Sequence, residues 1–180
     1  MGLFAGTPIG MLAGITFTAI LVMAAIGDMR TRRIPNRLVA ILAVLGFAFS
    51  VSQRPVFAGT LHGFEGLAVG LACWLPFYVL GWLGAGDVKL FAAAGAWLGP
   101  LGALEGALIG ALSGAVLAVL WMLRAHGVRS AVQTLGMAAG SPGILSSPAR
   151  GEKGRSTLPY GVAIAFGAIC AAWIPGLLLG

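Results

Sequence analysis

Charged residues are scarce in this sequence. Of its 180 residues only 9% are charged, and five acidic residues stand against eleven Lys and Arg. Soluble domains carry roughly a quarter charged residues, so this composition excludes an ordinary water-soluble domain. The chain is 59% hydrophobic and its mean hydropathy is +0.98. These values are typical of a protein whose solvent is largely lipid.

Cysteine and histidine are too few, and too far apart, for a disulfide framework or a metal site. Cys73 and Cys170 each lie alone in an apolar segment, without the paired spacing of zinc sites. We interpret both as small buried apolar residues. His62 and His126 lie at loop positions on opposite sides of the expected membrane, so they cannot share a metal ion. We therefore expect neither a metal nor a cofactor.

Long apolar segments are what the sequence does contain. A run of about 20 apolar residues crosses the roughly 30 Å hydrocarbon layer. Backbone groups in lipid must bond within the segment, and the two-residue alternation of barrel strands is missing. The sequence therefore predicts an all-α fold, a single integral-membrane helical bundle over residues 1–180. About six transmembrane segments are expected, at 8–27, 36–51, 62–83, 87–98, 101–123 and 158–178.

The positions of the basic residues predict the topology. Ten of the eleven Lys and Arg lie on the side of the odd-numbered connections, and only Arg54 lies on the other. The positive-inside rule then places these connections in the cytoplasm and both termini outside. A long cytoplasmic loop is expected at about 125–157, with a short surface helix in "VRSAVQTLGMA". The same asymmetry accounts for the net charge of +6, so no nucleic-acid partner is expected.

Two of the acids, Asp28 and Asp87, lie at the ends of apolar segments, where a carboxylate is energetically costly. Asp28 ends the first segment and Asp87 begins the fourth, so the topology puts both at the cytoplasmic boundary. A carboxylate at the centre of a spanning helix costs about 2.5–3.5 kcal/mol, and less near the interface. Two close carboxylates do not both ionise easily, so one keeps a proton while the other acts as a base. Such a pair can activate water and polarise a peptide carbonyl, and the glycines around Asp87 leave room for a substrate backbone.

Other interpretations of the acids stay open on residues alone. Asp28 could pair locally with Arg30 or Arg32, and Asp87 with Lys89. The two aspartates could also titrate in a small transporter or proton-coupled channel, although the chain lacks inverted repeats. For the remaining acids a packing, interfacial or solvated role is expected: Glu65, Glu105 and Glu152.

Three motifs resemble those of the prepilin peptidases. The stretch "GDMRTRRIPNR" at 27–37 resembles the first aspartate motif of that family. "GAGDVK" at 84–89 is similar to the Gly-x-Gly-Asp-x-Lys motif that holds the second aspartate. "LPYGVAIAFGA" at 158–168 resembles the last helix of the family. The three motifs occur in family order and extend from the first apolar segment to the last.

This resemblance implies a multi-pass aspartic endopeptidase of the inner membrane. Such enzymes remove the basic leader of type IV prepilins and pseudopilins on the cytoplasmic side, just before the apolar pilin helix. The resemblance implies that Asp28 and Asp87 are the catalytic pair. It implies site-shaping roles for Gly84, Gly86, Lys89, Pro159, Tyr160 and Gly161. It implies structural support around the first aspartate from Arg30, Ile34, Pro35 and Asn36.

Differences from the larger family members narrow the activity and the branch of the family that we expect. Those members carry two Cys-x-x-Cys pairs and also methylate the new pilin N-terminus, whereas this sequence has two isolated cysteines. Neither methyltransferase activity nor zinc is therefore expected. The small size resembles the peptidase-only branch that serves Flp-type (tight adherence) pili, with the archaeal preflagellin peptidases as the alternative. The runner-up is an intramembrane protease of the presenilin or signal-peptide-peptidase type, whose Pro-Ala-Leu motif is absent here.

Overall fold

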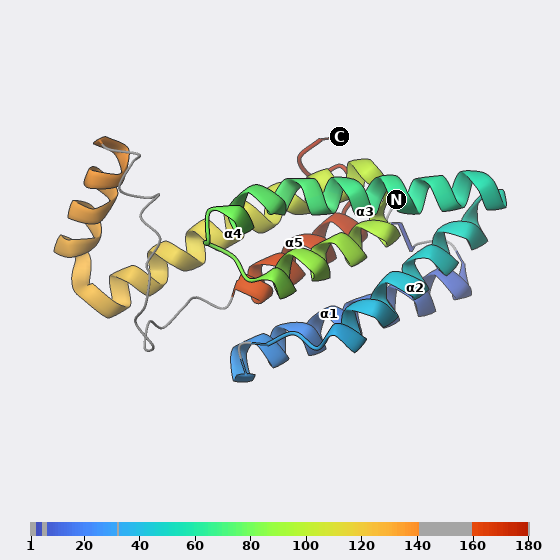
Figure 1. The fold of residues 1–180 in the computed structure, drawn as a ribbon, viewed down its shortest axis with the longest axis horizontal. Helices are drawn as coiled ribbons and strands as arrows, with labels where there is room; N and C mark the ends of the chain where they lie inside the picture. The colour runs from blue at the N-terminus through green and yellow to red at the C-terminus, as the bar shows by residue number, and fades with distance from the viewer. Residues whose placement is uncertain (1–2, 5–6, 32, 141–159, 180) are drawn as a thin grey trace.

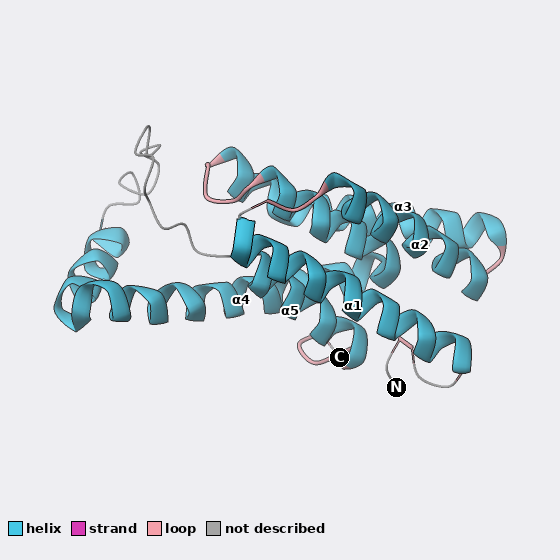
Figure 2. Cartoon of the chain, turned by 90° about the horizontal axis from the view of Figure 1, so that it is seen from below, coloured by secondary structure: helices cyan, strands magenta, loops and turns pink. Residues whose placement is uncertain are grey.

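The computed structural model describes residues 3–4, 7–31, 33–140 and 160–179, and side chains outside 121–140. Within these residues every regular element is a helix (Figure 2), which confirms the predicted all-α class. The five helices are α1 (Pro8–Thr31), α2 (Asn36–Gln53), α3 (Val56–Val79), α4 (Ala85–Gly140) and α5 (Tyr160–Trp173).

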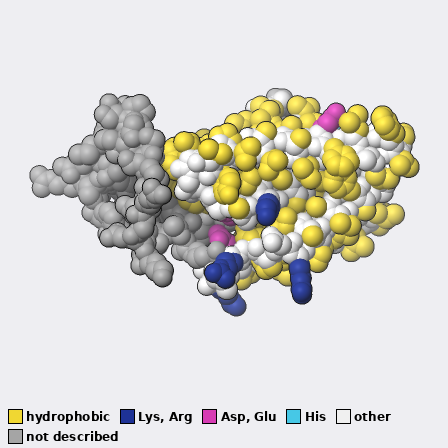
Figure 3. All heavy atoms as spheres, in the orientation of Figure 1, with side chains coloured by type: hydrophobic (Ala, Val, Ile, Leu, Met, Phe, Trp, Pro, Cys, Tyr) yellow, Lys and Arg dark blue, Asp and Glu magenta, His cyan; other side chains and the backbone are white. Residues whose placement is uncertain are grey.

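Four of the helices are long and apolar enough to cross a membrane. These are α1, α2, α3 and the 36-residue part Ala85–Leu120 of α4, whereas α5 is apolar but shorter. The visible face of the molecule is largely hydrophobic (Figure 3). The chain is therefore a helical membrane protein. The predicted count of about six crossings and the outside position of both termini are not confirmed by these helices and stay predictions.

The predicted segments 87–98 and 101–123 both lie in α4, and the chain reverses direction between them. Gly99 has a φ of +71°, a conformation that glycine adopts at little cost, and Pro100 follows it. In a straight helix, Phe91 and Gly106 would be about 22 Å apart. Here a Cβ placed on Gly106 would lie 3.3 Å from the Phe91 ring. The two parts of α4 therefore lie side by side and run in opposite directions (Figure 1).

Small residues let the helices approach α4, which contacts α2, α3 and α5. The backbones of Gly66 in α3 and Gly95 in α4 are in direct contact. Gly167 of α5 lies against the backbone of Gly106 and Gly110 in the second part of α4. Gly106 and Gly110, four residues apart, thus let α5 pack closely on α4, as small residues at this spacing do in membrane helices.

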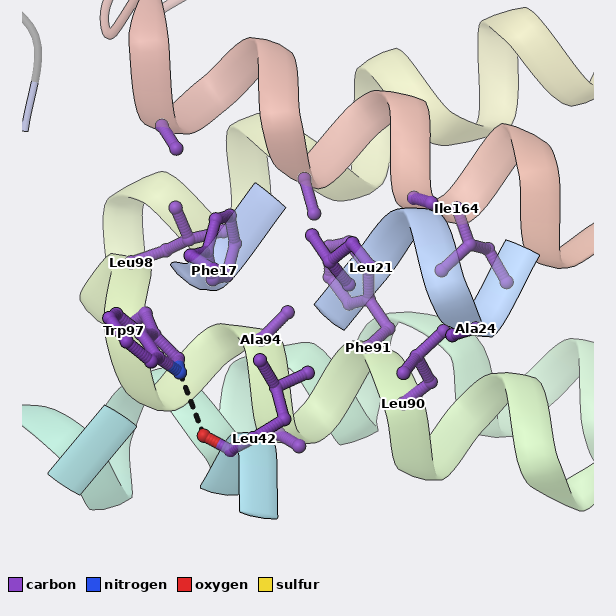
Figure 4. Packing of buried hydrophobic residues seen from close by; sticks show 14 of the residues in the cluster. Phe17, Leu21, Ala24, Leu42, Leu90, Phe91, Ala94, Trp97, Leu98 and Ile164 are labelled. Carbon is purple, nitrogen blue, oxygen red and sulfur yellow. Dashed lines mark hydrogen bonds between the residues drawn. The ribbon is translucent and has the colours of Figure 1, made fainter. Parts of the chain in front are cut away.

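A core of large side chains fixes the helices that position the two aspartates (Figure 4). Phe17 of α1 and Phe49 of α2 pack on Trp97 of α4, with ring centroids 5.3 and 5.4 Å from the indole. The Trp97 Nε1–H donates a hydrogen bond of 2.7 Å to the Leu42 carbonyl oxygen of α2. Because buried polar groups need partners, this bond and the ring contacts set α1 and α2 against α4.

Several sequence expectations about polar residues need correction or refinement. His62 lies inside α3 rather than in a loop, and its ring packs on Gly99. Cys73 and Cys170 are free and partly buried rather than fully buried. Glu105 is buried, and its carboxylate accepts two backbone N–H groups of the C-terminal turn, a packing role as expected. The side chain of Glu65 is exposed.

The predicted polar connection at 125–157 begins as helix. α4 continues to Gly140, so the segment expected to form a surface helix has a helical backbone. The remainder of the connection, with Glu152, lies outside the described residues.

Candidate active site

Asp87 lies in the first turn of α4, where its carboxylate bonds back to the start of the helix. Its Oδ2 accepts a hydrogen bond of 3.3 Å from the N–H of Gly84, and its own N–H donates to the Gly84 carbonyl at 3.1 Å. The bond from the Gly84 N–H to the Asp87 side chain is one half of a capping box, and the helix dipole favours a carboxylate there. Asp87 is 9% exposed, and its Oδ1 has no hydrogen-bond partner among the described residues. One carboxylate oxygen is held by the backbone, and the other is buried without a hydrogen-bond partner among the described residues.

Asp28 lies near the end of α1 and is held by the first turn of α5. Its side chain is 7% exposed, and its Oδ2 accepts a hydrogen bond of 3.1 Å from the N–H of Gly161. A Cβ on Gly161 would lie 2.9 Å from that oxygen, so a side chain at this position would push the carboxylate away. Each aspartate therefore accepts a backbone N–H at the N-terminal end of a helix, where N–H groups are unpaired and favour anions.

The two aspartates line one pocket of about 340 Å³. The connection between α1 and α2 and the first turn of α4 supply its other walls: Arg33, Ile34, Asn36, Gly84, Ala85, Gly86 and Lys89. Basic side chains gather near an acidic one on one part of the face in Figure 3. Asp28 and Asp87 therefore share one pocket in the structure. Their catalytic role stays a prediction.

Local ion pairing does not account for the two aspartates within the part of the chain that the structure describes. No described basic side chain forms an ion pair with either carboxylate; the bonds of both are to backbone N–H groups. Lys89 is exposed and lines the same pocket without such a contact, and Arg30 is exposed outside it. Arg32 lies outside the described residues.

The other predicted site residues divide into those at the pocket and those away from it. Predicted residues that line it are Ile34, Asn36, Gly84, Gly86 and Lys89, and Gly161 contacts Asp28 directly. Arg30 and Pro35 do not line it, and Tyr160 lines a neighbouring apolar pocket instead. Pro159 lies outside the described residues.

Sequence reasoning missed two residues of the pocket, Arg33 and Ala85. Both lie inside the quoted motif stretches, Arg33 next to Ile34 and Ala85 between two glycines. Their position between predicted site residues was the available signal.

Comparison with known proteins places the two aspartates in a matched region. Residues 15–119 match the family model described as the type IV leader peptidase family. The chain is 35% identical over 114 residues to a "Prepilin leader peptidase/N-methyltransferase" of Pectobacterium carotovorum subsp. carotovorum, covering 59% of this chain and 40% of the relative. It is 33% identical over 115 residues to a protein of the same name from Xanthomonas campestris pv. campestris, covering 60% and 39%. The chain thus spans about two fifths of the length of these curated relatives. No solved structure matches.

Proposed function

Because the chain belongs to the type IV leader peptidase family, we propose that it is an aspartic endopeptidase of the inner membrane. Its proposed reaction is removal of the basic leader of a type IV prepilin at the cytoplasmic face. The observation that carries this proposal is the pocket shared by Asp28 and Asp87, two buried carboxylates from different helices. Buried acids in a membrane protein are costly and mark functional sites by default.

In the proposed mechanism the two carboxylates share one proton. The ionised carboxylate takes a proton from water, and the water oxygen attacks the carbonyl carbon of the scissile bond. The protonated carboxylate donates a hydrogen bond to the carbonyl oxygen as negative charge develops there. When the tetrahedral intermediate collapses, the C–N bond breaks and a proton passes to the leaving amine. The Gly84 and Gly161 N–H groups hold the Oδ2 atoms. Oδ1 of Asp87, which is buried and has no hydrogen-bond partner among the described residues, is the proposed site of the shared proton.

The proposed substrate has a cleavage site at the membrane surface. A prepilin carries a basic leader in the cytoplasm and an apolar helix in the bilayer, so its scissile bond lies at the interface. Both aspartates lie at ends of apolar helices, which suits a bond at that depth. The finer proposal is an Flp-type prepilin, supported by "RIPN" in the first motif.

Co-expression with an Flp-type prepilin is expected to convert the precursor to a faster-migrating product on a gel. Mass spectrometry of that product is expected to place the cut between the basic leader and the apolar helix. A cut inside the apolar helix would instead favour a protease of the presenilin or signal-peptide-peptidase type. Precursor that stays intact while the enzyme accumulates in the membrane would contradict the proposed function.

Gly161→Ala is expected to lower the rate of leader removal by about 10²-fold, because a misplacement of about 1 Å can cost that much. The added methyl would lie 2.9 Å from Oδ2 and 3.1 Å from Cγ of Asp28, so the carboxylate must shift. The loss is expected in kcat rather than in KM, measured on purified enzyme with a prepilin substrate.

Gly27→Ala is the matched control for this variant. A Cβ there would meet only the Arg33 carbonyl oxygen, at an ordinary 3.8 Å, although Gly27 directly precedes Asp28 in the chain. Its cleavage rate is expected to stay close to that of the wild type. Equal rates for Gly161→Ala and the wild type would show that the Gly161 contact does not position Asp28 for the reaction.

A further inference from the structure

Helix α5 carries the Gly161 N–H that holds Asp28, so the position of this helix along its own axis matters for the pocket of the two aspartates. With 14 residues it is about 21 Å long, at 1.5 Å per residue, and it does not fill the roughly 30 Å of hydrocarbon. Its length alone therefore does not fix its depth in a membrane. A shift of one residue would move Gly161 by about 1.5 Å, so contacts with neighbouring helices must set the register of α5.

The middle of α5 packs on the second part of α4 through glycine. Gly167 lies directly against the backbone of Gly106 and Gly110. Helices interlock when side-chain ridges of one enter the grooves of the other. Glycines supply no such ridge, so this contact brings the two helices close together but resists sliding along the axis only weakly.

Glu105 attaches the far end of α5 to the second part of α4. Its side chain is 4% exposed, and each of its carboxylate oxygens accepts a backbone N–H from the turn that follows α5. Oε2 accepts the N–H of Gly176 at 2.9 Å, and Oε1 accepts that of Leu178 at 3.0 Å. Such charge-assisted bonds are about twice as strong as those between neutral groups. Within the described residues, these two are the hydrogen bonds that join the turn to α4.

Side-chain packing contributes little to holding the turn after α5. A pocket of about 280 Å³ lies beside it, lined by Glu105, Gly176 and Leu179 together with residues of α4 and α5. The leucine side chains of the turn are about half exposed, at 53% for Leu177, 46% for Leu178 and 50% for Leu179. The carboxylate of Glu105 is therefore the main attachment of this turn.

We propose that Glu105 is a positioning residue: its clamp on the turn sets the register of α5 and thereby places the Gly161 N–H against Asp28. The proposal rests on the proposed function of the aspartate pair. Glu105 does not line the pocket of the aspartates, so it touches none of the reacting groups and acts only through α5. Buried acids in a membrane protein are costly and are kept where they serve a function. For Glu105 that function is the placement of Asp28.

Glu105→Gln is expected to lower kcat for leader removal about tenfold, with KM within about twofold of the wild type, because a displacement well below 1 Å already costs rate. Glutamine keeps the length of the side chain but accepts only one of the two N–H groups, and its own NH2 faces the other. The measurement uses purified enzyme in detergent with a full prepilin. Glu65→Gln makes the same change at an exposed acid of α3 and is expected to keep both constants. An unchanged kcat in Glu105→Gln would overturn the proposal.

A double-mutant cycle with Gly161→Ala separates positioning from a general loss of structure. If Glu105 acts through the Gly161 contact, Glu105→Gln adds no further loss once Gly161→Ala has displaced Asp28, since coupled residues are non-additive. The double variant is then as slow as Gly161→Ala alone. Losses that multiply would show that Glu105 affects the rate by another route, and would overturn the assignment.

Leu178→Pro removes one bond of the clamp from the other partner, so the proposal is tested even where Glu105→Gln does not fold. Proline lacks the N–H, and the Leu178 side chain is half exposed, so the bundle core is left as it is. The same fall in kcat at constant KM is expected. Leu179→Pro is the matched control, because the Leu179 N–H donates to no described group, and it is expected to keep kcat. Full kcat in Leu178→Pro would contradict the clamp.

These outcomes are separable from failure of the proposed function. A wild-type enzyme that leaves the prepilin intact contradicts the peptidase itself. A wild-type enzyme that cuts, with Glu105→Gln and Leu178→Pro both at full kcat, contradicts only the positioning role of Glu105.

Discussion

Asp28→Asn and Asp87→Asn are each expected to lower the rate of leader removal by at least about 10³-fold, within the range for losing a general acid or base. Asparagine keeps the shape of the side chain but cannot give up or take the proton that the reaction moves. Its Oδ1 can still accept the N–H of Gly84 or Gly161, so the contacts that hold each side chain are retained. The loss is therefore expected in chemistry rather than in folding.

Single-turnover cleavage of a prepilin by purified variants measures this prediction. Amounts of each variant in the membrane fraction, and its circular dichroism in detergent, show that the bundle has formed. Glu65→Gln, which neutralises an exposed acid away from the pocket, is the matched control and is expected to cleave normally. Because groups that act as a unit are non-additive, the double Asn variant is expected to be no slower than either single variant. Cleavage within tenfold of wild type by either single variant would rule out a dyad.

The sequence could predict that the two aspartates lie close together, because the depth of a residue in the membrane follows from its position along an apolar segment. Apolar segment ends and the positions of basic residues are enough to place Asp28 and Asp87 at the same boundary. The structure brings both to one pocket. The resemblance implied a site-shaping role for Gly161. That its N–H holds Asp28 was not predicted, because the two residues lie 133 positions apart in the chain. Which helix faces which depends on packing, and a single sequence does not encode it locally.

The third motif shows why neighbouring motif residues can differ in role. Successive residues of a helix point about 100° apart, since 3.6 residues complete a turn. Gly161 therefore meets Asp28 while Tyr160 lines the apolar pocket. The reversal inside α4 follows from Gly99 and Pro100, and the predicted break between segments 87–98 and 101–123 located it. The sequence did not reveal how closely the two parts of α4 pack on each other, because that depends on Phe91 filling the space beside Gly106.

Electrostatics alone does not explain how a basic leader would bind here. Basic side chains are exposed around the pocket, with Arg33 and Lys89 on its walls and Arg30 and Arg37 nearby in the chain. Like charges repel the leader, and the proposed mechanism reserves the two buried aspartates for the reaction. For the proposed substrate we therefore expect binding to come mainly from apolar contacts with the segment after the cut, for which exposed apolar helix faces are available.

A leader peptide that lacks the apolar helix is therefore expected to be cut at least about 10²-fold less efficiently than the full prepilin. Each large apolar side chain buried on binding contributes about 1.5–3 kcal/mol, and about 1.4 kcal/mol is a factor of ten. Losing two such contacts is enough for the expected difference. The measurement is kcat/KM for both substrates, with the same enzyme preparation in the same detergent.

A prepilin whose apolar helix keeps its composition in shuffled order separates general burial from specific recognition. If apolar burial supplies the binding energy, the shuffled helix restores most of the lost kcat/KM, provided that the residue after the cut is unchanged. Binding energy from remote parts of a substrate also helps to hold the reacting bond in place. The short peptide is therefore expected to lose kcat as well as affinity. Equal kcat/KM for the short peptide and the full prepilin would mean that the leader itself is recognised, in spite of its charge.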